Sequence, residues 1–196
     1  GADVVIHSTT KFINGHGTVI GGALVCRDPD FMENGGGALV RYIGAVPSAM
    51  DCWLTSIGLK TLPLRMREHC ANARALAEFL DSNDRVARTH WPGLENHPQH
   101  EIAARQMDDF GAMISIDMGD FDSATRLMDG LSMCSLAVSL GNVDTLVQHP
   151  ASMTHRLMSE EDRLAVGITN GMIRISAGIE SAKDIIADFD RAISGL

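Results

Sequence analysis

The most informative stretch of this 196-residue chain is His7–Gly17, which reads HSTTKFINGHG. It overlaps the end of one apolar segment, Val4–His7, and precedes another, Val19–Val25. Both segments read as short strands, so the stretch between them is the loop of a strand–loop–strand unit. Lys11 stands in this loop among hydroxyl residues. A desolvated lysine amine can form a Schiff base with a carbonyl compound, although a solvated loop lysine is the commoner interpretation of the lysine by itself.

The overall composition predicts a globular protein of the cytoplasm. Hydrophobic residues make up 45% of the chain and charged residues 21%, and no apolar run approaches the roughly 18 residues that a membrane span requires. The net charge is −9, with basic residues dispersed among acidic ones, so neither nucleic acid nor a membrane is expected as a partner. The cysteines are widely spaced, as is typical of a reducing compartment: Cys26, Cys52, Cys70 and Cys134.

The apolar spacing predicts an α+β layout for most of the chain. Helical spacing begins near Ser48 and is interrupted by Pro63, which predicts two helices or one helix kinked at Leu62-Pro63. The segment Phe31–Gly44 is glycine-rich and poorly periodic, and no element is predicted there. Four further strands are predicted to form one sheet: Val86–His90, Ala112–Met118, Ser135–Val138 and Ile173–Ala177. Four further helices are predicted at Gln99–Met107, Ser123–Leu131, Ser159–Val166 and Ala182–Ile193.

The whole stretch His7–Gly17 closely resembles the lysine motif of the Cys/Met metabolism enzymes that depend on pyridoxal 5′-phosphate (PLP), a family of γ-lyases, γ-synthases and sulfhydrylases. Further matching blocks follow in the family's order along nearly the entire chain: Gly44–Ser48, Gly58–Leu62, Arg65-Met66, Ser139–Gly141, His149–His155 and Ile173–Glu180. The resemblance implies an α/β fold, that of the fold-type-I PLP-dependent transferases. Residues 1–60 would end the large PLP-binding domain, and residues 61–196 would form an α+β C-terminal domain with a four-stranded sheet.

The resemblance also implies roles for residues of the lysine motif. Lys11 matches the lysine that binds PLP and later carries protons as general base and acid. Ser8 and Thr10 match positions whose hydroxyl groups hold the phosphate of the cofactor. PLP is therefore the expected cofactor.

Three residues of the C-terminal region match positions on the substrate's carboxylate side. Arg174 matches the carboxylate-binding arginine, whose guanidinium fork suits a planar carboxylate. By itself, an arginine between Ile173 and Ile175 would be interpreted as part of a salt bridge. Ser139 and Thr154 match further positions that line this side, the former through hydroxyl or backbone contacts.

Two histidine pairs raise the question of a metal site. His97 and His100 form His-x-x-His, and His149 and His155 flank Pro150. No cysteine or acidic ligand completes either pair, so no metal site is predicted.

Substrate-side residues favour a methionine γ-lyase, which converts methionine to methanethiol, ammonia and 2-oxobutanoate. Val138 stands where the cystathionine enzymes of the family typically carry glutamate, and Gln148 and Met153 also look like γ-lyase residues. Val40-Arg41 and Ile57 depart from the usual γ-lyase pattern. An O-acetylhomoserine or O-succinylhomoserine sulfhydrylase and a cystathionine γ-synthase or γ-lyase therefore remain alternatives.

Several parts of a PLP site are not evident in this sequence. In the family, the acid that pairs with the pyridine nitrogen, the stacked aromatic ring and most of the phosphate cup lie upstream of the lysine or come from a neighbouring subunit. Asp3 is too close to Lys11 to be that acid. We therefore expect the C-terminal half of an enzyme that acts on an amino-acid substrate and forms a homotetramer, built as a dimer of dimers. An inert C-terminal fragment or assembly module is the alternative of another class.

Overall fold

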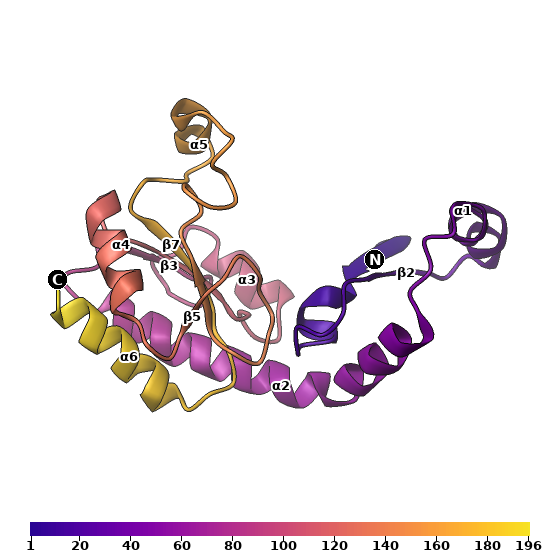
Figure 1. The fold of residues 1–196 in the computed structure, drawn as a ribbon, viewed down its shortest axis with the longest axis horizontal. Coiled ribbons are helices and arrows are strands. Elements are labelled where there is room, and N and C mark those ends of the chain that lie inside the picture. The colour runs from indigo at the N-terminus through magenta and orange to yellow at the C-terminus, as the bar shows by residue number, and fades with distance from the viewer. The chain divides into compact units, whose positions relative to one another are not determined.

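The computed structural model describes residues 1–196, which form two compact units, Gly1–Pro63 and Leu64–Leu196 (Figure 1). The division between the two units falls after Pro63, three residues beyond the boundary at residue 60 that the resemblance implies. The assignment of residues 1–60 to a PLP-binding large domain and of residues 61–196 to a small domain stays a prediction.

The first unit is built on a two-stranded antiparallel sheet. Strand β1 (Val4–Ser8) pairs with β2 (Gly22–Cys26), with Val4 opposite Cys26 and Ser8 opposite Gly22. Both strands are confirmed, although the second begins at Gly22 rather than Val19. Between them lies η1 (Thr9–Ile13), a short π-helical turn.

The segment after β2 is helical, where the sequence indicates no element. It forms η2 (Phe31–Gly36) and α1 (Gly37–Ile43). Sequence periodicity misses these turns because consecutive glycines have low helix propensity and carry no side chains that could mark a buried face. Helix α1 ends at Gly44, whose φ of 75° is the left-handed conformation of a helix C-cap.

Helix α2 (Ala49–Asp81) begins in the first unit and ends in the second. Its start is fixed by Ser48, whose hydroxyl accepts a hydrogen bond from the Asp51 N–H at 3.1 Å, while the Asp51 carboxylate accepts from the Ser48 N–H at 3.2 Å. This reciprocal cap satisfies N–H groups that the first helical turn leaves free. Pro63 lies inside the helix, so a single helix forms rather than two.

The second unit contains a five-stranded sheet in the order β3-β4-β7-β6-β5. Its strands are β3 (Arg88–His90), β4 (Met113–Asp117), β5 (Ser135–Leu136), β6 (Leu146–Gln148) and β7 (Met172–Ser176). All neighbours are antiparallel except β5 and β6. The predicted four-stranded sheet is wrong, because β6 lies between β5 and β7. All three residues of β6 are buried. A strand that is buried on both faces does not need alternating polar and apolar residues, so this sequence pattern does not reveal it.

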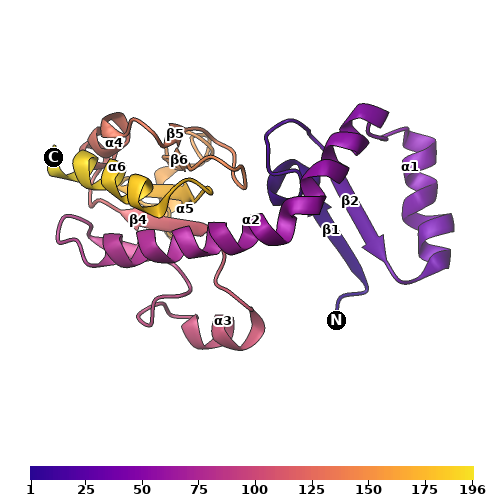
Figure 2. The same cartoon turned by 90° about the horizontal axis from the view of Figure 1, so that it is seen from below.

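The second unit also contains five helical segments. They are α3 (His100–Gln106), α4 (Phe121–Gly130), α5 (Glu160–Ala165), α6 (Ala182–Ser194) and the C-terminal part of α2. Of these, α4 contacts both β7 and α6, while α5 buries none of its residues. All four helices predicted after α2 are confirmed to within two residues at each end. Figure 1 and Figure 2 both show α6 running beside α2, and Arg85, just beyond α2, donates to the Ile193 carbonyl of α6 at 2.7 Å. The largest fully buried side chains all lie in this unit, among them Trp91, Phe189 and Leu76.

Candidate functional site

Lys11 lies at a break in the helical geometry of the loop that follows β1. Its φ of −91° and ψ of −137° are not helical. Its carbonyl accepts a hydrogen bond from the Gly15 N–H at 2.8 Å, and the Thr9 carbonyl accepts from the Asn14 N–H at 3.1 Å. Lys11 itself is half-buried. The backbone on both sides of the lysine is thus fixed, which gives its side chain a defined starting direction.

Asn14 organises the rest of this loop. Its side chain is 1% exposed, and its Oδ1 accepts from the His16 N–H at 3.2 Å and from the N–H and hydroxyl of Thr18 at 3.3 and 3.2 Å. Gly58 of α2 comes close to the same residue, since a Cβ at position 58 would stand 2.2 Å from the Asn14 carbonyl oxygen. Both residues belong to motifs of the sequence, but their contact brings together segments far apart in the chain and could not be predicted from it.

The hydroxyl groups near Lys11 have different surroundings. Thr10 Oγ1 donates to the Gly21 carbonyl at 3.3 Å and accepts from the Gly21 N–H at 3.0 Å, so in this structure it ties the loop to the segment before β2. Ser8 is exposed at the end of β1. An amine and a hydroxyl fit the carbonyl carbon and the phosphate of PLP. A phosphate bond from Thr10 would require its proton to leave Gly21, and the roles of these residues stay predictions.

Arg174 is held by carbonyl oxygens rather than by an acidic side chain. It lies on β7, half-buried, and its Nη2 donates to the Ser139 carbonyl at 2.7 Å and to the Val138 carbonyl at 3.3 Å. The Arg74–Asp109 and Arg191–Asp188 ion pairs do not include Arg174. Burial lowers the pKa of the Arg174 guanidinium, but an arginine stays protonated at any physiological pH.

This arrangement leaves the charge of Arg174 without a balancing anion. Its Nε is buried and has no hydrogen-bond partner in the protein. A buried donor without an acceptor is costly, and a positively charged one is a ready site for a carboxylate. The salt-bridge interpretation of Arg174 is therefore wrong.

Ser139 contacts Arg174 directly, whereas Thr154 is linked to it through Gln148. Ser139 contacts the arginine through its carbonyl oxygen. Gln148 on β6 lies directly opposite Arg174 on β7, and its Nε2 donates to Thr154 Oγ1 at 3.2 Å. The Gln148 Oε1 is buried and has no protein partner. The sequence marks Gln148 only through the family resemblance, because its place beside the arginine depends on strand register.

His149 has a structural role at the base of the turn that carries Thr154. Its side chain is 1% exposed, its Nε2–H donates to the Asn170 carbonyl at 2.8 Å, and its Nδ1 accepts from the Ser152 hydroxyl at 2.8 Å. Both ring nitrogens are thus occupied. Among residues 1–196, no group of three or more histidine, cysteine, aspartate or glutamate side chains is arranged to hold a metal ion.

The six predicted site residues form two groups. Ser8, Thr10 and Lys11 lie in the first unit, and Ser139, Thr154 and Arg174 lie in the second. Each group is compact within its own unit.

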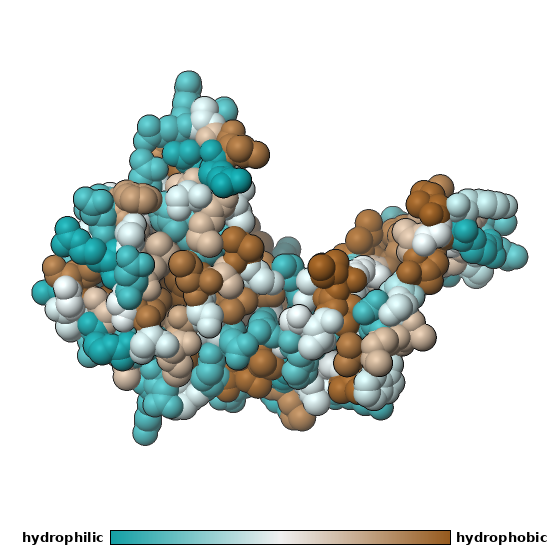
Figure 3. All heavy atoms as spheres, in the orientation of Figure 1, coloured by the Kyte–Doolittle hydropathy of each residue, from teal (hydrophilic) through white to brown (hydrophobic).

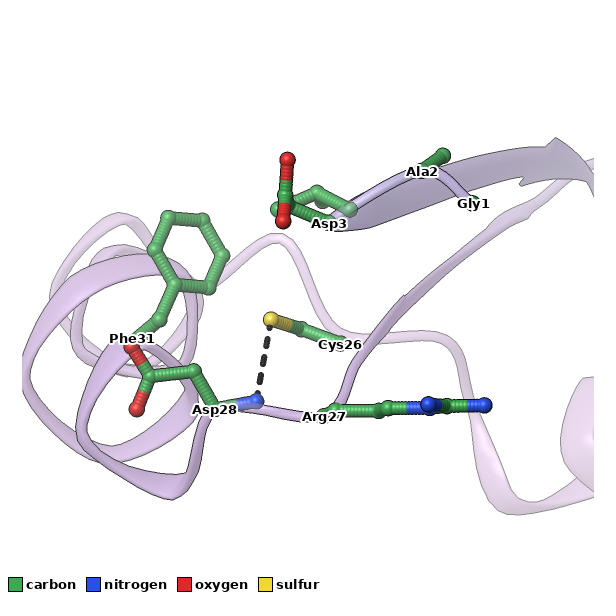
Figure 4. A pocket seen from close by; sticks show the side chains of 8 residues that line it. Gly1, Ala2, Asp3, Cys26, Arg27, Asp28 and Phe31 are labelled. Carbon is green, nitrogen blue, oxygen red and sulfur yellow. Dashed lines mark hydrogen bonds between the residues drawn. The ribbon is translucent and has the colours of Figure 1, made fainter.

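A hollow of about 590 Å³ in the first unit contains none of these residues. Figure 4 shows its wall, in which Asp3, Cys26 and Phe31 face the space and the Asp28 N–H donates to Cys26 Sγ at 3.3 Å. The chain terminus, Gly1, forms part of this wall.

No helix in residues 1–196 is both long and apolar enough to cross a membrane.

The fold defines a class, the α/β fold of PLP-dependent enzymes of amino-acid metabolism, and confirms the expected fold-type-I class. The particular family follows from the sequence. The chain belongs to the Cys/Met metabolism PLP-dependent enzymes, and it matches this family over residues 1–194. PLP is the cofactor of that family.

Individual relatives agree with this assignment. L-methionine gamma-lyase of Fusobacterium nucleatum subsp. polymorphum is 47% identical over 98% of this chain, and cystathionine beta-lyase of Lactococcus lactis subsp. cremoris is 43% identical over 98%. The structure of cystathionine gamma synthase from Xanthomonas oryzae pv. oryzae, solved with aminoacrylate and cysteine, matches 99% of this chain with a TM-score of 0.94 and 46% identity. The chain spans 49% and 50% of the two relatives and 50% of the solved chain, about half their length.

Proposed function

We propose that the full-length protein is a PLP-dependent carbon–sulfur lyase that acts on methionine by γ-elimination. With uptake of one water, methionine would give methanethiol, ammonia and 2-oxobutanoate. The observation that carries this proposal is the uncompensated charge of Arg174, which is oriented by two carbonyls and offers a buried Nε–H to an acceptor. An α-carboxylate is the acceptor that an amino-acid substrate would supply.

The residues of the first unit would serve the cofactor and the protons. When bound, PLP supplies an electron sink that weakens the bonds at the substrate's Cα. Lys11 would bind it covalently, and Ser8 and Thr10 would donate to its phosphate. The Nζ of Lys11 would then take the proton from Cα and move protons at Cβ and Cγ as general base and acid.

The residues of the second unit would hold the substrate. Arg174 would pair with the carboxylate and so fix which Cα bond faces the base, and Ser139 and Thr154 would line the same side. Val138 contributes an apolar, exposed side chain beside this group. An apolar residue suits a substrate without a second charged end, which favours methionine over cystathionine.

A replacement reaction on an acylated homoserine is the second candidate. Val40-Arg41 and Ile57 depart from the γ-lyase pattern, and the relatives include a cystathionine gamma synthase. Elimination and replacement share their early proton transfers, so Lys11 and Arg174 serve both.

The test is a product assay on the full-length protein with added PLP. It is incubated with methionine alone and, separately, with O-acetylhomoserine or O-succinylhomoserine plus sulfide, while 2-oxobutanoate and homocysteine are followed. We expect 2-oxobutanoate from methionine, and its loss in Lys11→Ala but not in the exposed control Lys183→Ala. Homocysteine without 2-oxobutanoate would favour the second candidate, and no product with no bound cofactor would favour an assembly module.

We further propose that the full-length protein is a cytoplasmic homotetramer, a dimer of dimers. All four cysteines are free, as suits a reducing compartment. Analytical ultracentrifugation of the full-length protein measures the oligomeric state directly.

A further inference from the structure

The orientation of Arg174 depends on two backbone carbonyl groups of a neighbouring loop. The two acceptors of its Nη2 are the carbonyl oxygens of Val138 and Ser139. Both belong to the connection between β5 and β6. A shift of this connection would therefore turn the guanidinium.

The loop is not fixed by its own regular structure. β5 has two residues and β6 has three, and they pair in parallel across the connection. Midway along, Gly141 has a φ of 76°, a left-handed conformation that glycine adopts without strain. Loops of this kind need side-chain partners for their backbone groups.

One such partner comes from the same strand as Arg174. The Gly141 N–H donates to Ser176 Oγ at 2.9 Å, and both residues are buried, Ser176 completely. Ser176 follows Arg174 by two residues on β7, so the two side chains leave the strand on the same face. The strand that carries the arginine thus also carries the group that holds the arginine's loop.

A second set of hydrogen bonds holds the end of the loop that precedes β6. The Glu180 carboxylate accepts from the Thr145 N–H at 2.5 Å and from the Thr145 hydroxyl at 2.9 Å, and the Val143 carbonyl accepts from the Ile179 N–H at 2.8 Å. These contacts attach the end of the connection to the turn that follows β7. Earlier in the loop, the Ser176 hydroxyl accepts a hydrogen bond from the Gly141 N–H, two residues after the Ser139 carbonyl that Arg174 contacts.

We propose that Ser176 is a positioning residue for substrate recognition: its hydroxyl holds the Gly141 N–H, keeps the Val138 and Ser139 carbonyls in place, and so sets the direction in which Arg174 meets the substrate's carboxylate. This inference rests on the proposed function, because it assigns Arg174 to a carboxylate. Ser176 itself touches no reacting atom.

The test compares two variants of the full-length protein that each lose one buried hydroxyl. Ser176→Ala removes the partner of Gly141. Thr89→Val removes a hydroxyl on β3 that is buried and has no hydrogen-bond partner. We expect Ser176→Ala to raise the KM for the amino-acid substrate about fivefold, with kcat within about twofold, and Thr89→Val to leave both unchanged. Ser176→Thr, which keeps the hydroxyl but adds a methyl group at a buried position, is expected to raise KM less than Ser176→Ala does.

A result in which Ser176→Ala lowers kcat and leaves KM unchanged would overturn the inference. Glu180→Gln provides a second variant should Ser176→Ala not fold, since it weakens the hydrogen bonds at Thr145 and is expected to raise KM in the same way. An unchanged KM in Glu180→Gln would then count against the inference.

Amide hydrogen exchange gives a readout that needs no substrate. In Ser176→Ala, exchange at Gly141 is expected to speed up on the order of fivefold, while Ala177, whose N–H donates to the Ala112 carbonyl, stays protected. Unchanged exchange at Gly141 would refute the inference even in an active enzyme. Faster exchange in a protein that does not act on methionine would instead locate the failure in the proposed function.

Discussion

At the scale of single residues, Arg174 and its two carbonyl acceptors make a specific prediction about substitution by lysine. An ammonium group keeps the charge but has no planar fork, so it cannot bond the Val138 and Ser139 carbonyls and a carboxylate with the same geometry. Arg174→Lys in the full-length protein should raise the KM for the amino-acid substrate roughly 10- to 100-fold, the equivalent of about one charge-assisted hydrogen bond.

The matched control is Arg126→Lys, at an exposed position on α4. Steady-state kinetics on the two variants give the comparison. Equal KM values for Arg174→Lys and the unsubstituted protein would show that the guanidinium does not bind the carboxylate.

The residues proposed to carry the chemistry can be predicted from the sequence, but the residues that hold them in place cannot. Lys11 and Arg174 lie in contiguous motifs that can be recognised without any structure. Asn14, Gln148 and Ser176 act through contacts fixed by strand register or by the approach of a distant helix, and a linear pattern contains neither. From the sequence alone, Arg174 would be interpreted as part of a salt bridge, because only the three-dimensional structure shows that no acidic side chain pairs with it.

At the scale of elements, Asp188 joins α6 to the segment before β5. Its side chain is 2% exposed and accepts from the N–H groups of Ser132, Met133 and Cys134 at 3.0 Å or less, as well as from Arg191. Burial alone would raise the pKa of this carboxyl, but these hydrogen bonds outweigh burial and hold the pKa well below its usual value.

This network predicts a loss of stability on substitution and in acid. Because the pKa of Asp188 is lower in the folded than in the unfolded state, its contribution is fully present above the unfolded value of about 3.9 and is lost as the pH falls towards the folded value. Asp188→Asn should lower the free energy of unfolding by about 2–3 kcal/mol at neutral pH, since an amide cannot accept from all of these donors. Urea titrations at pH 7 and pH 3 measure this, with the exposed Asp190→Asn as control. An equal loss at both pH values would contradict the assignment.

Gly58 makes a second prediction at this scale, about the contact of α2 with the Lys11 loop. Alanine has a higher helix propensity than glycine by about 1 kcal/mol, which by itself would stabilise α2. Here the added Cβ would stand 2.2 Å from the backbone oxygen of Asn14, so the loop must move. Gly58→Ala should therefore weaken retention of PLP by the full-length protein.

Retention is measured by dialysis and the visible absorbance of the bound cofactor. The control is Ser56→Ala on the same helix, which removes only an exposed hydroxyl bonded to the Cys52 carbonyl. If Gly58→Ala retains PLP as well as Ser56→Ala does, the close approach has no bearing on the Lys11 loop.

Helices and strands could be predicted where their periodic pattern of apolar residues extended over several residues. The start of α2 follows from Ser48, and the strands at Ala112–Met118 and Ile173–Ala177 alternate clearly enough to be placed as β4 and β7. Strand β6 could not be found, because a three-residue buried run has the same sequence signature in a strand, a turn or a helix. The helical turns of Phe31–Ile43 were missed because glycine hides the pattern.

At the scale of the whole molecule, the two units differ in how much apolar surface they bury. Val19 is the buried apolar side chain of the first unit, whereas the second contains the rest of the core, from Cys70 to Ile193. The first unit also exposes large apolar side chains, including Ile20 at 90% and Ile43 at 72%, and Figure 3 shows apolar surface on this unit. Burial of apolar surface is the main favourable term in folding, so the second unit should be far more stable by itself.

This difference predicts the hydrogen-exchange pattern of the 196-residue polypeptide. Amides of β4 and β7, in the centre of the five-stranded sheet, should exchange slowly, and those of β1 and β2 on the order of 100-fold faster or more, because a two-stranded sheet with so little core opens locally. In a protein of the full length of its relatives, we expect β1 and β2 to become protected as further chain covers their apolar side chains. Exchange followed by mass spectrometry on both polypeptides makes the comparison. Equal protection of β1 and β7 in the 196-residue polypeptide would show that the first unit folds without help, and PLP binding by Lys11 would then need no further part of the protein for its scaffold.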